Sequence, residues 1–122
     1  MAKELDSGIK EMFFSTDKRL NRLRYLKRSV ALLPIAIILN VAANSLGDNP
    51  SLLYLLFLLA VIVAVVVSCF MLNIRRLHDM NMTGWLSVLG LIPIVDIVFE
   101  LVLLFKKGTD GDNKYGSDPL RI

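Results

Sequence analysis

Three long apolar stretches, residues 29–46, 51–74 and 84–105, alternate with short polar segments along the chain. The second, SLLYLLFLLAVIVAVVVSCFMLNI, would be apolar on every side of a helix, and a small soluble protein could not bury it. Each stretch is close to the roughly 20 residues that an α-helix needs to cross a bilayer. The pattern predicts an all-α integral membrane protein with three transmembrane helices, folded as a single domain over residues 1–122.

The segments outside the three stretches are polar. Leu5, Ile9, Met12 and Phe13 fall at helical spacing, which predicts a short amphipathic N-terminal helix lying on the membrane surface. The alternative for this segment is a frayed tail. Residues 47–50 form a tight turn between the first two stretches. The last segment, residues 106–122, is rich in Gly, Asp, Asn and Pro, so we expect an irregular C-terminal tail.

Positive charge is concentrated beside the apolar stretches. The chain carries 14 Lys and Arg against 11 Asp and Glu, and the position of the basic residues favours the cytoplasmic flank of a span over nucleic-acid binding. Contact with anionic lipids is compatible with this interpretation. Trp85 fits the aromatic belt at the membrane surface. The residues expected at the membrane interface are Arg19, Arg22, Arg24, Lys27, Arg28, Arg75, Arg76 and Trp85.

Two topologies fit the charges. With three spans, the N-terminus and the connector 75–83 share one side, with ten Lys and Arg against four in the tail. This favours a cytoplasmic N-terminus. Alternatively, Pro93 breaks the third stretch into a re-entrant hairpin, and both termini are then cytoplasmic.

Several sequence motifs are more specific than hydropathy. RRLHD at 75–79 is followed by Thr83-Gly84-Trp85 and Pro93, and Arg19-Leu20-Asn21-Arg22 precedes the first stretch. The tail carries Gly108, Thr109, Gly111, Asn113, Tyr115, Gly116, Asp118 and Pro119. Together, over about residues 13–119, these motifs resemble the domain-of-unknown-function 805 family of small bacterial inner-membrane proteins. The resemblance implies a compact helical membrane domain, with His78 and Asp79 among the motif residues, and implies no established activity. Family members usually carry a small or apolar residue where this chain has Asp96.

Four polar residues lie inside the apolar stretches. Asp96 and Glu100 share one face of the third stretch at i, i+4 spacing, as do Asn40 and Asn44 on the first. In the three-span topology the two pairs lie at matching depths, so we expect them to face each other within a subunit or between copies. The carboxylates are then either a polar tie between helices or a proton or cation site.

The chain offers little catalytic chemistry. It has one His, His78, and one Cys, Cys69, so we expect no metal site and no cofactor. No nucleophile–base pair and no phosphate-binding loop is recognisable. We expect a non-enzymatic inner-membrane component, an accessory or scaffold that associates with itself or with a larger membrane protein. The alternative is a small oligomeric channel or transporter that uses Asp96 and Glu100.

Overall fold

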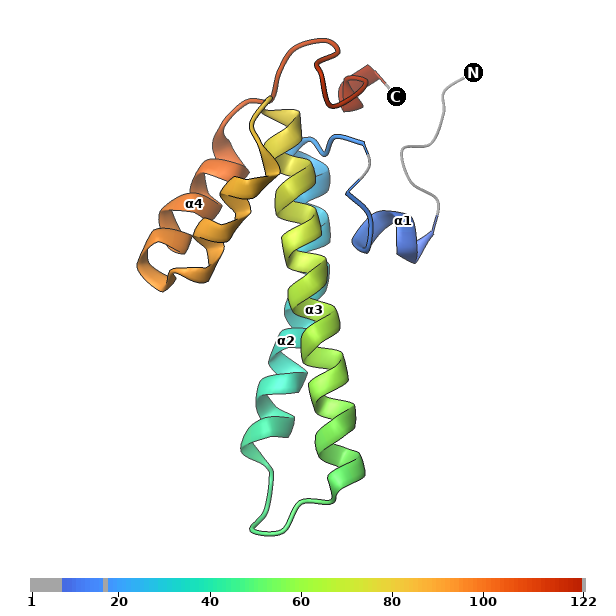
Figure 1. Ribbon diagram of the computed structural model, residues 1–122, viewed down its shortest axis with the longest axis vertical. Coiled ribbons are helices and arrows are strands. Elements are labelled where there is room, and N and C mark those ends of the chain that lie inside the picture. The colour runs from blue at the N-terminus through green and yellow to red at the C-terminus, as the bar shows by residue number, and fades with distance from the viewer. Residues whose placement is uncertain (1–7, 17, 122) are drawn as a thin grey trace.

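The computed structural model describes residues 8–16 and 18–121, and within them every regular element is a helix (Figure 1). The all-α prediction is confirmed for this part of the chain. In chain order the elements are α1 (Ile9–Phe13), α2 (Arg22–Asn44), α3 (Leu52–Asp79), the 3₁₀ helix η1 (Gly84–Leu91), α4 (Pro93–Phe105) and the short 3₁₀ helix η2 (Pro119–Arg121).

Helices α2 and α3 form a long antiparallel hairpin that runs the height of the molecule (Figure 1). Each begins at a capped end, because the side chain of Asn21 accepts from Arg24 N and that of Ser51 accepts from Tyr54 N. At about 1.5 Å per residue, the helices are about 35 and 42 Å long. Only 6% of the most apolar window of α2 is buried, and 17% of that of α3. Both are candidate membrane spans by length and composition.

The third apolar stretch is not one helix, so the predicted third transmembrane helix over residues 84–105 is not confirmed. Ile92 takes an extended conformation (φ −99°, ψ 111°), and Pro93 begins α4. A proline disfavours the helical conformation of the residue before it and has no N–H to continue the helix. Consequently η1 and α4 fold back against each other as a short hairpin beside the end of α3 (Figure 1).

Neither arm of this hairpin is long enough to cross a bilayer. The 3₁₀ arm, 8 residues, is about 16 Å long, and the 13 residues of α4 are about 20 Å long, against a core of about 30 Å. The re-entrant alternative describes this geometry better than a third span does.

Helix α1 and the C-terminal tail both lie toward the end of the hairpin at which α2 starts and α3 ends (Figure 1). Helix α1 is short and packs against α3, and Ile9 on it is exposed. A short N-terminal helix is therefore present over residues 9–13, and Leu5 lies outside the described residues. That this helix lies on the membrane surface stays a prediction. The tail is irregular as expected, with an isolated bridge between Asn113 and Gly116.

The buried core lies at this end of the molecule. It joins α2, α3 and the hairpin, and along the other half of α2 and α3 few side chains are buried. The core also contains an unusual number of charged side chains. Its apolar members are Leu20, Tyr25, Leu72, Leu77, Met80, Phe99 and Leu103.

Candidate functional site

Two arginines converge on one aspartate at the end of α3, and we call Arg19, Arg76 and Asp79 the arginine junction. The arginines are fully buried and Asp79 is 3% exposed. Arg19 Nη2 lies 3.0 Å from Asp79 Oδ1, with Nε at 3.2 Å from the same oxygen. Arg76 Nη1 pairs with Oδ2. Both carboxylate oxygens are thus neutralised by charge-assisted hydrogen bonds.

The remaining guanidinium donors of Arg76 bind backbone carbonyls at the end of α4. Arg76 Nε donates to Leu103 O at 2.7 Å, and Nη2 donates to Lys106 O. The last carbonyls of a helix have no partner within the helix, so Arg76 supplies one. This requires the five forked donors of arginine, which lysine lacks.

Arg19 ties the tail to the same point. Its Nη1 donates to Gly111 O and its Nη2 to Thr109 O, each at 2.6 Å. Thr109 N in turn donates to Asp79 O at 2.7 Å. The arginine junction therefore joins the segment before α2, the end of α3, the hairpin and the tail.

The motif residues of the tail hold its own turn and dock it on α3. Asp118 accepts from Gly111 N at 2.9 Å, and Asn113 Nδ2 donates to His78 O at 2.9 Å. The rings of His78 and Tyr115 stack with centroids 4.0 Å apart. Gly111 (φ 73°) takes a backbone conformation that favours glycine. These contacts serve structure, and they give a physical reason for this sequence pattern.

Three further motif positions have local roles. Gly84 begins η1 where a Cβ would lie 2.9 Å from Ile74 Cγ2, so the missing side chain permits close packing on α3. Pro93 breaks the third stretch, as described above. Gly116 (φ 136°) lies in the tail turn, and Pro119 O accepts from Arg24 Nη1 at 2.8 Å.

The interface prediction is wrong for three of the basic residues. Arg19, Arg75 and Arg76 are fully buried, because their donors satisfy carbonyls where four chain segments meet. Arg75 donates to Lys18 O at 3.1 Å and to Glu11 O at 2.9 Å.

The other basic residues of that set differ in exposure. Arg22 and Lys27 are exposed, Arg24 is half-buried, and Arg28 is buried and donates to Met12 O at 3.4 Å. Trp85 is 84% exposed on η1, so the surface positions of Arg22, Lys27 and Trp85 remain compatible with lipid contact.

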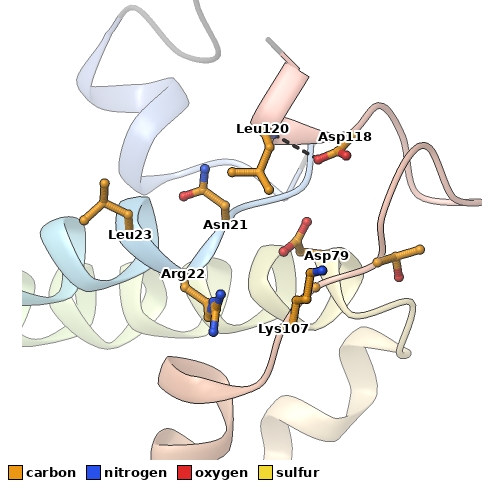
Figure 2. A pocket seen from close by; sticks show the side chains of 9 residues that line it. Asn21, Arg22, Leu23, Asp79, Lys107, Asp118 and Leu120 are labelled. Atoms are coloured by element: carbon orange, nitrogen blue, oxygen red, sulfur yellow. Dashed lines mark hydrogen bonds between the residues drawn. The ribbon is translucent and has the colours of Figure 1, made fainter.

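A cleft of about 190 Å³ opens between the start of α2 and the tail (Figure 2). Arg22 and Lys107 line it together with the carboxylates of Asp79 and Asp118. The Asp79 carboxylate is already paired with the two arginines of the junction, and the Asp118 carboxylate already accepts from backbone amides. The cleft combines both signs of charge, and its lining residues include no nucleophile–base pair.

A second polar group lies deeper, and we call Tyr25, Asn73 and Glu100 the Glu100 cluster. The Tyr25 hydroxyl is 2.8 Å from Asn73 Oδ1 and also bonds to Glu100, while Asn73 Nδ2 donates to Glu100 Oε1 at 3.2 Å. The cluster joins α2, α3 and α4 beside a cavity of about 200 Å³ that Ser29 and Cys69 also line. Sequence reasoning missed Tyr25 and Asn73. The signal that could have pointed to this cluster is Asn73, a single Asn within the most apolar stretch.

The predicted contact between the two polar pairs does not form within the subunit. Asn44 Nδ2 donates to Asn40 Oδ1 at 3.0 Å, and both residues are exposed. Glu100 instead bonds to Tyr25, about 22 Å from Asn40 along α2. The physical reason is that α4 returns toward the end from which the hairpin starts. Asp96, half-buried on α4, stays at this end as well.

Among the described residues, no group of three or more His, Cys, Asp and Glu side chains could hold a metal ion. The arginine junction is built from charge pairs and bonds to backbone carbonyls. Its clearest chemical capacity is to fix four segments in one arrangement.

In sequence, the chain is similar to bacterial inner-membrane proteins. The chain is 36% identical over 85 residues to the inner membrane protein YhaI of Escherichia coli (strain K12), which covers 70% of this chain and 69% of that protein. It is 40% identical over 45 residues to the inner membrane protein YhaH of the same strain, 37% of each chain. No solved structure matches. A family model described as a protein of unknown function, DUF805, matches residues 13–117, and the chain therefore belongs to this inner-membrane family.

Proposed function

We propose that this protein is a non-catalytic component of the inner membrane, an accessory or scaffold protein that acts through helix–helix association. The observation that carries the proposal is the exposure of Asn40 and Asn44 on the apolar surface of α2. The ionisable residues that could have suggested catalysis instead hold the fold together in the arginine junction and the Glu100 cluster. The inner-membrane relatives support the location.

The depth of Asn40 makes its exposure costly. Along α2, Asn40 is about 18 Å beyond Arg28, within a core of about 30 Å, whereas Asn44 is the last residue of the helix and lies nearer its far end. Their bond to each other leaves one amide NH₂ and one carbonyl oxygen exposed. Polar groups in hydrocarbon favour association with another helix, by about 0.6–2 kcal/mol for each contact. A second copy of α2 offers the same complementary pair.

Replacing both asparagines in the variant Asn40→Leu/Asn44→Leu is expected to weaken self-association about tenfold or more, because two interhelical polar contacts are lost. Energy transfer between labelled copies in liposomes, measured against protein-to-lipid ratio, reports the association. Asn49→Leu makes the same change in the exposed turn and serves as the control. A wild-type protein that stays monomeric in the bilayer would contradict self-association.

We further propose two crossings, by α2 and α3, with both termini in the cytoplasm. Every Lys and Arg of the chain precedes Ser29 or follows Ile74, so the turn between α2 and α3 carries none. A two-span arrangement therefore places all 14 basic residues on one side, which the positive-inside rule favours over ten against four. Lys106 and Lys107, awkward in a three-span topology, then face the cytoplasm.

This topology predicts the side from which introduced cysteines react. In a Cys69→Ser background, Asp48→Cys is expected to react with a membrane-impermeant maleimide on intact spheroplasts. Lys10→Cys and Lys107→Cys are expected to react only after permeabilisation, because their segments lie inside. Labelling of Lys107→Cys from outside would instead indicate that the third stretch crosses.

The alternative of a channel or transporter has less support. Asp96 and Glu100 lie on a hairpin whose arms are too short to cross. Glu100 bonds to Tyr25 and Asn73 at one end of the molecule. An ion path through these carboxylates would have to be completed by other copies of the chain.

A further inference from the structure

An apolar groove of about 360 Å³ lies between α1, α2 and α3. Phe13 from α1, Leu32 from α2 and Val65 from α3 are among its walls. Ser68 is the one polar side chain that lines it. A cavity of about 150 Å³ is large enough for benzene, so this groove has room for a segment of about twelve carbons.

Ser68 is unusual among the buried polar groups of the described chain. It is 1% exposed, and its Oγ has no hydrogen-bond partner there. A buried hydroxyl without a partner costs free energy, and most buried polar groups have one. A donor in an otherwise apolar groove therefore points to a ligand that is mostly hydrocarbon and carries a hydrogen-bond acceptor.

The position of the groove matches a lipid. Along α3, Ser68 is about 10 Å from Arg75, below the end of the molecule where the basic residues gather. Lys27 is exposed one turn before Ala31, which lines the groove, and Lys10 is exposed beside Ile9, which also lines it. Positive charge therefore flanks the end of the groove nearest the membrane surface.

Helix α1 forms one wall of the groove and is held in place by arginines from α2 and α3. Arg28 donates to Met12 O at 3.4 Å and Arg75 to Glu11 O at 2.9 Å. A partner helix could enter only if α1 moved and these bonds broke. A single flexible chain enters from the bilayer without disturbing α1.

We propose that the groove binds one acyl chain of an anionic phospholipid. The Ser68 hydroxyl donates to an ester carbonyl of the lipid, and Lys10 and Lys27 attract its headgroup. This site does not include Asn40 or Asn44, so the test of lipid binding does not depend on whether the protein associates with itself.

Native mass spectrometry of the purified protein in mild detergent, titrated with phosphatidylglycerol, tests the site. We expect one saturable lipid, bound more tightly than phosphatidylcholine. Ala64→Leu fills the groove and should weaken binding about tenfold. Ser68→Ala removes the donor and should weaken binding about fivefold. Ala43→Leu, the same change on the exposed surface of α2, should bind as the wild type does.

The headgroup is tested separately. Lys10→Gln/Lys27→Gln should weaken phosphatidylglycerol binding and leave phosphatidylcholine unchanged, since only the charge attraction is removed. Circular dichroism verifies the helix content of every variant. Equal binding by Ala64→Leu and the wild type, non-saturable binding, or equal affinity for both lipids would overturn the proposal. A measured mass that shows a second protein chain bound in place of the lipid would also overturn the proposal.

Discussion

Replacing Asp79 with alanine is expected to lower the free energy of unfolding by about 3–5 kcal/mol, because it leaves two buried guanidinium charges without their counter-ion. Arg19 and Arg76 have no exposed surface through which water could solvate them. Their remaining bonds to carbonyls neutralise no charge. We expect the tail and the hairpin to lose their fixed positions together, since both are attached at this point.

The chain offers a matched control for this change. Asp110 pairs with Lys107 at 3.3 Å with the same i, i+3 separation as Asp79 and Arg76, but both side chains are largely exposed. Exposed pairs contribute about 0–1 kcal/mol, so Asp110→Ala should have little effect. Denaturant unfolding in detergent, followed by circular dichroism, and trypsin cleavage of the tail measure both variants. Similar losses in the two would show that burial of the arginine junction contributes no stability.

The arginine junction also explains why polar residues are frequent in the sequence motifs of this chain. The helix ends at this side of the molecule and the irregular tail present carbonyls that need donors. Arginine supplies several donors from one side chain, and Asp79 offsets part of the charge that this brings into the core. The motif is thus accounted for by the assembly of helix ends and tail.

Hydropathy was sufficient to predict α2 and α3, because a long apolar run has one stable structure in a membrane. The break at Ile92 and Pro93 could also have been predicted from the sequence, since a proline disfavours the helical conformation of the residue before it. The prediction that Asn40 faces Asp96 is wrong within the subunit, because α4 returns toward the start of α2 and the predicted helix over residues 84–105 is broken at Ile92. Contact between these residues on different copies of the chain stays a prediction.

Long-range partners could not be predicted from local patterns. Arg19 and Asp79 are 60 positions apart, and Arg19 and Gly111 are 92 apart. Nothing in the spacing of the basic residues before α2 distinguishes Arg19, which is buried, from Lys27, which is exposed. The family resemblance includes both Arg19 and the tail among its motifs, but only the structure shows the bonds that join them.

Gly108→Ala is expected to destabilise the protein by about 3 kcal/mol or more, because the new methyl group would occupy the position of the Asp79 carboxylate. A Cβ at residue 108 would lie 2.0 Å from Asp79 Oδ2, 2.6 Å from its Cγ and 3.1 Å from its backbone oxygen. Overpacking alone costs about 1–3 kcal/mol, and here relief requires moving a carboxylate that Arg19 and Arg76 hold. Displacing it separates buried charges.

A double-mutant cycle distinguishes this mechanism from a general defect in the tail. Combined with Asp79→Ala, Gly108→Ala should add about 0.5 kcal/mol or less, because the clashing carboxylate is gone and the two effects are not additive. Gly47→Ala is the control, since nothing lies within 4 Å of a Cβ there, and it should be neutral. The measurement is the same denaturant unfolding in detergent. If Gly108→Ala costs as much without Asp79 as with it, its effect arises in the tail backbone and the carboxylate clash is not the cause.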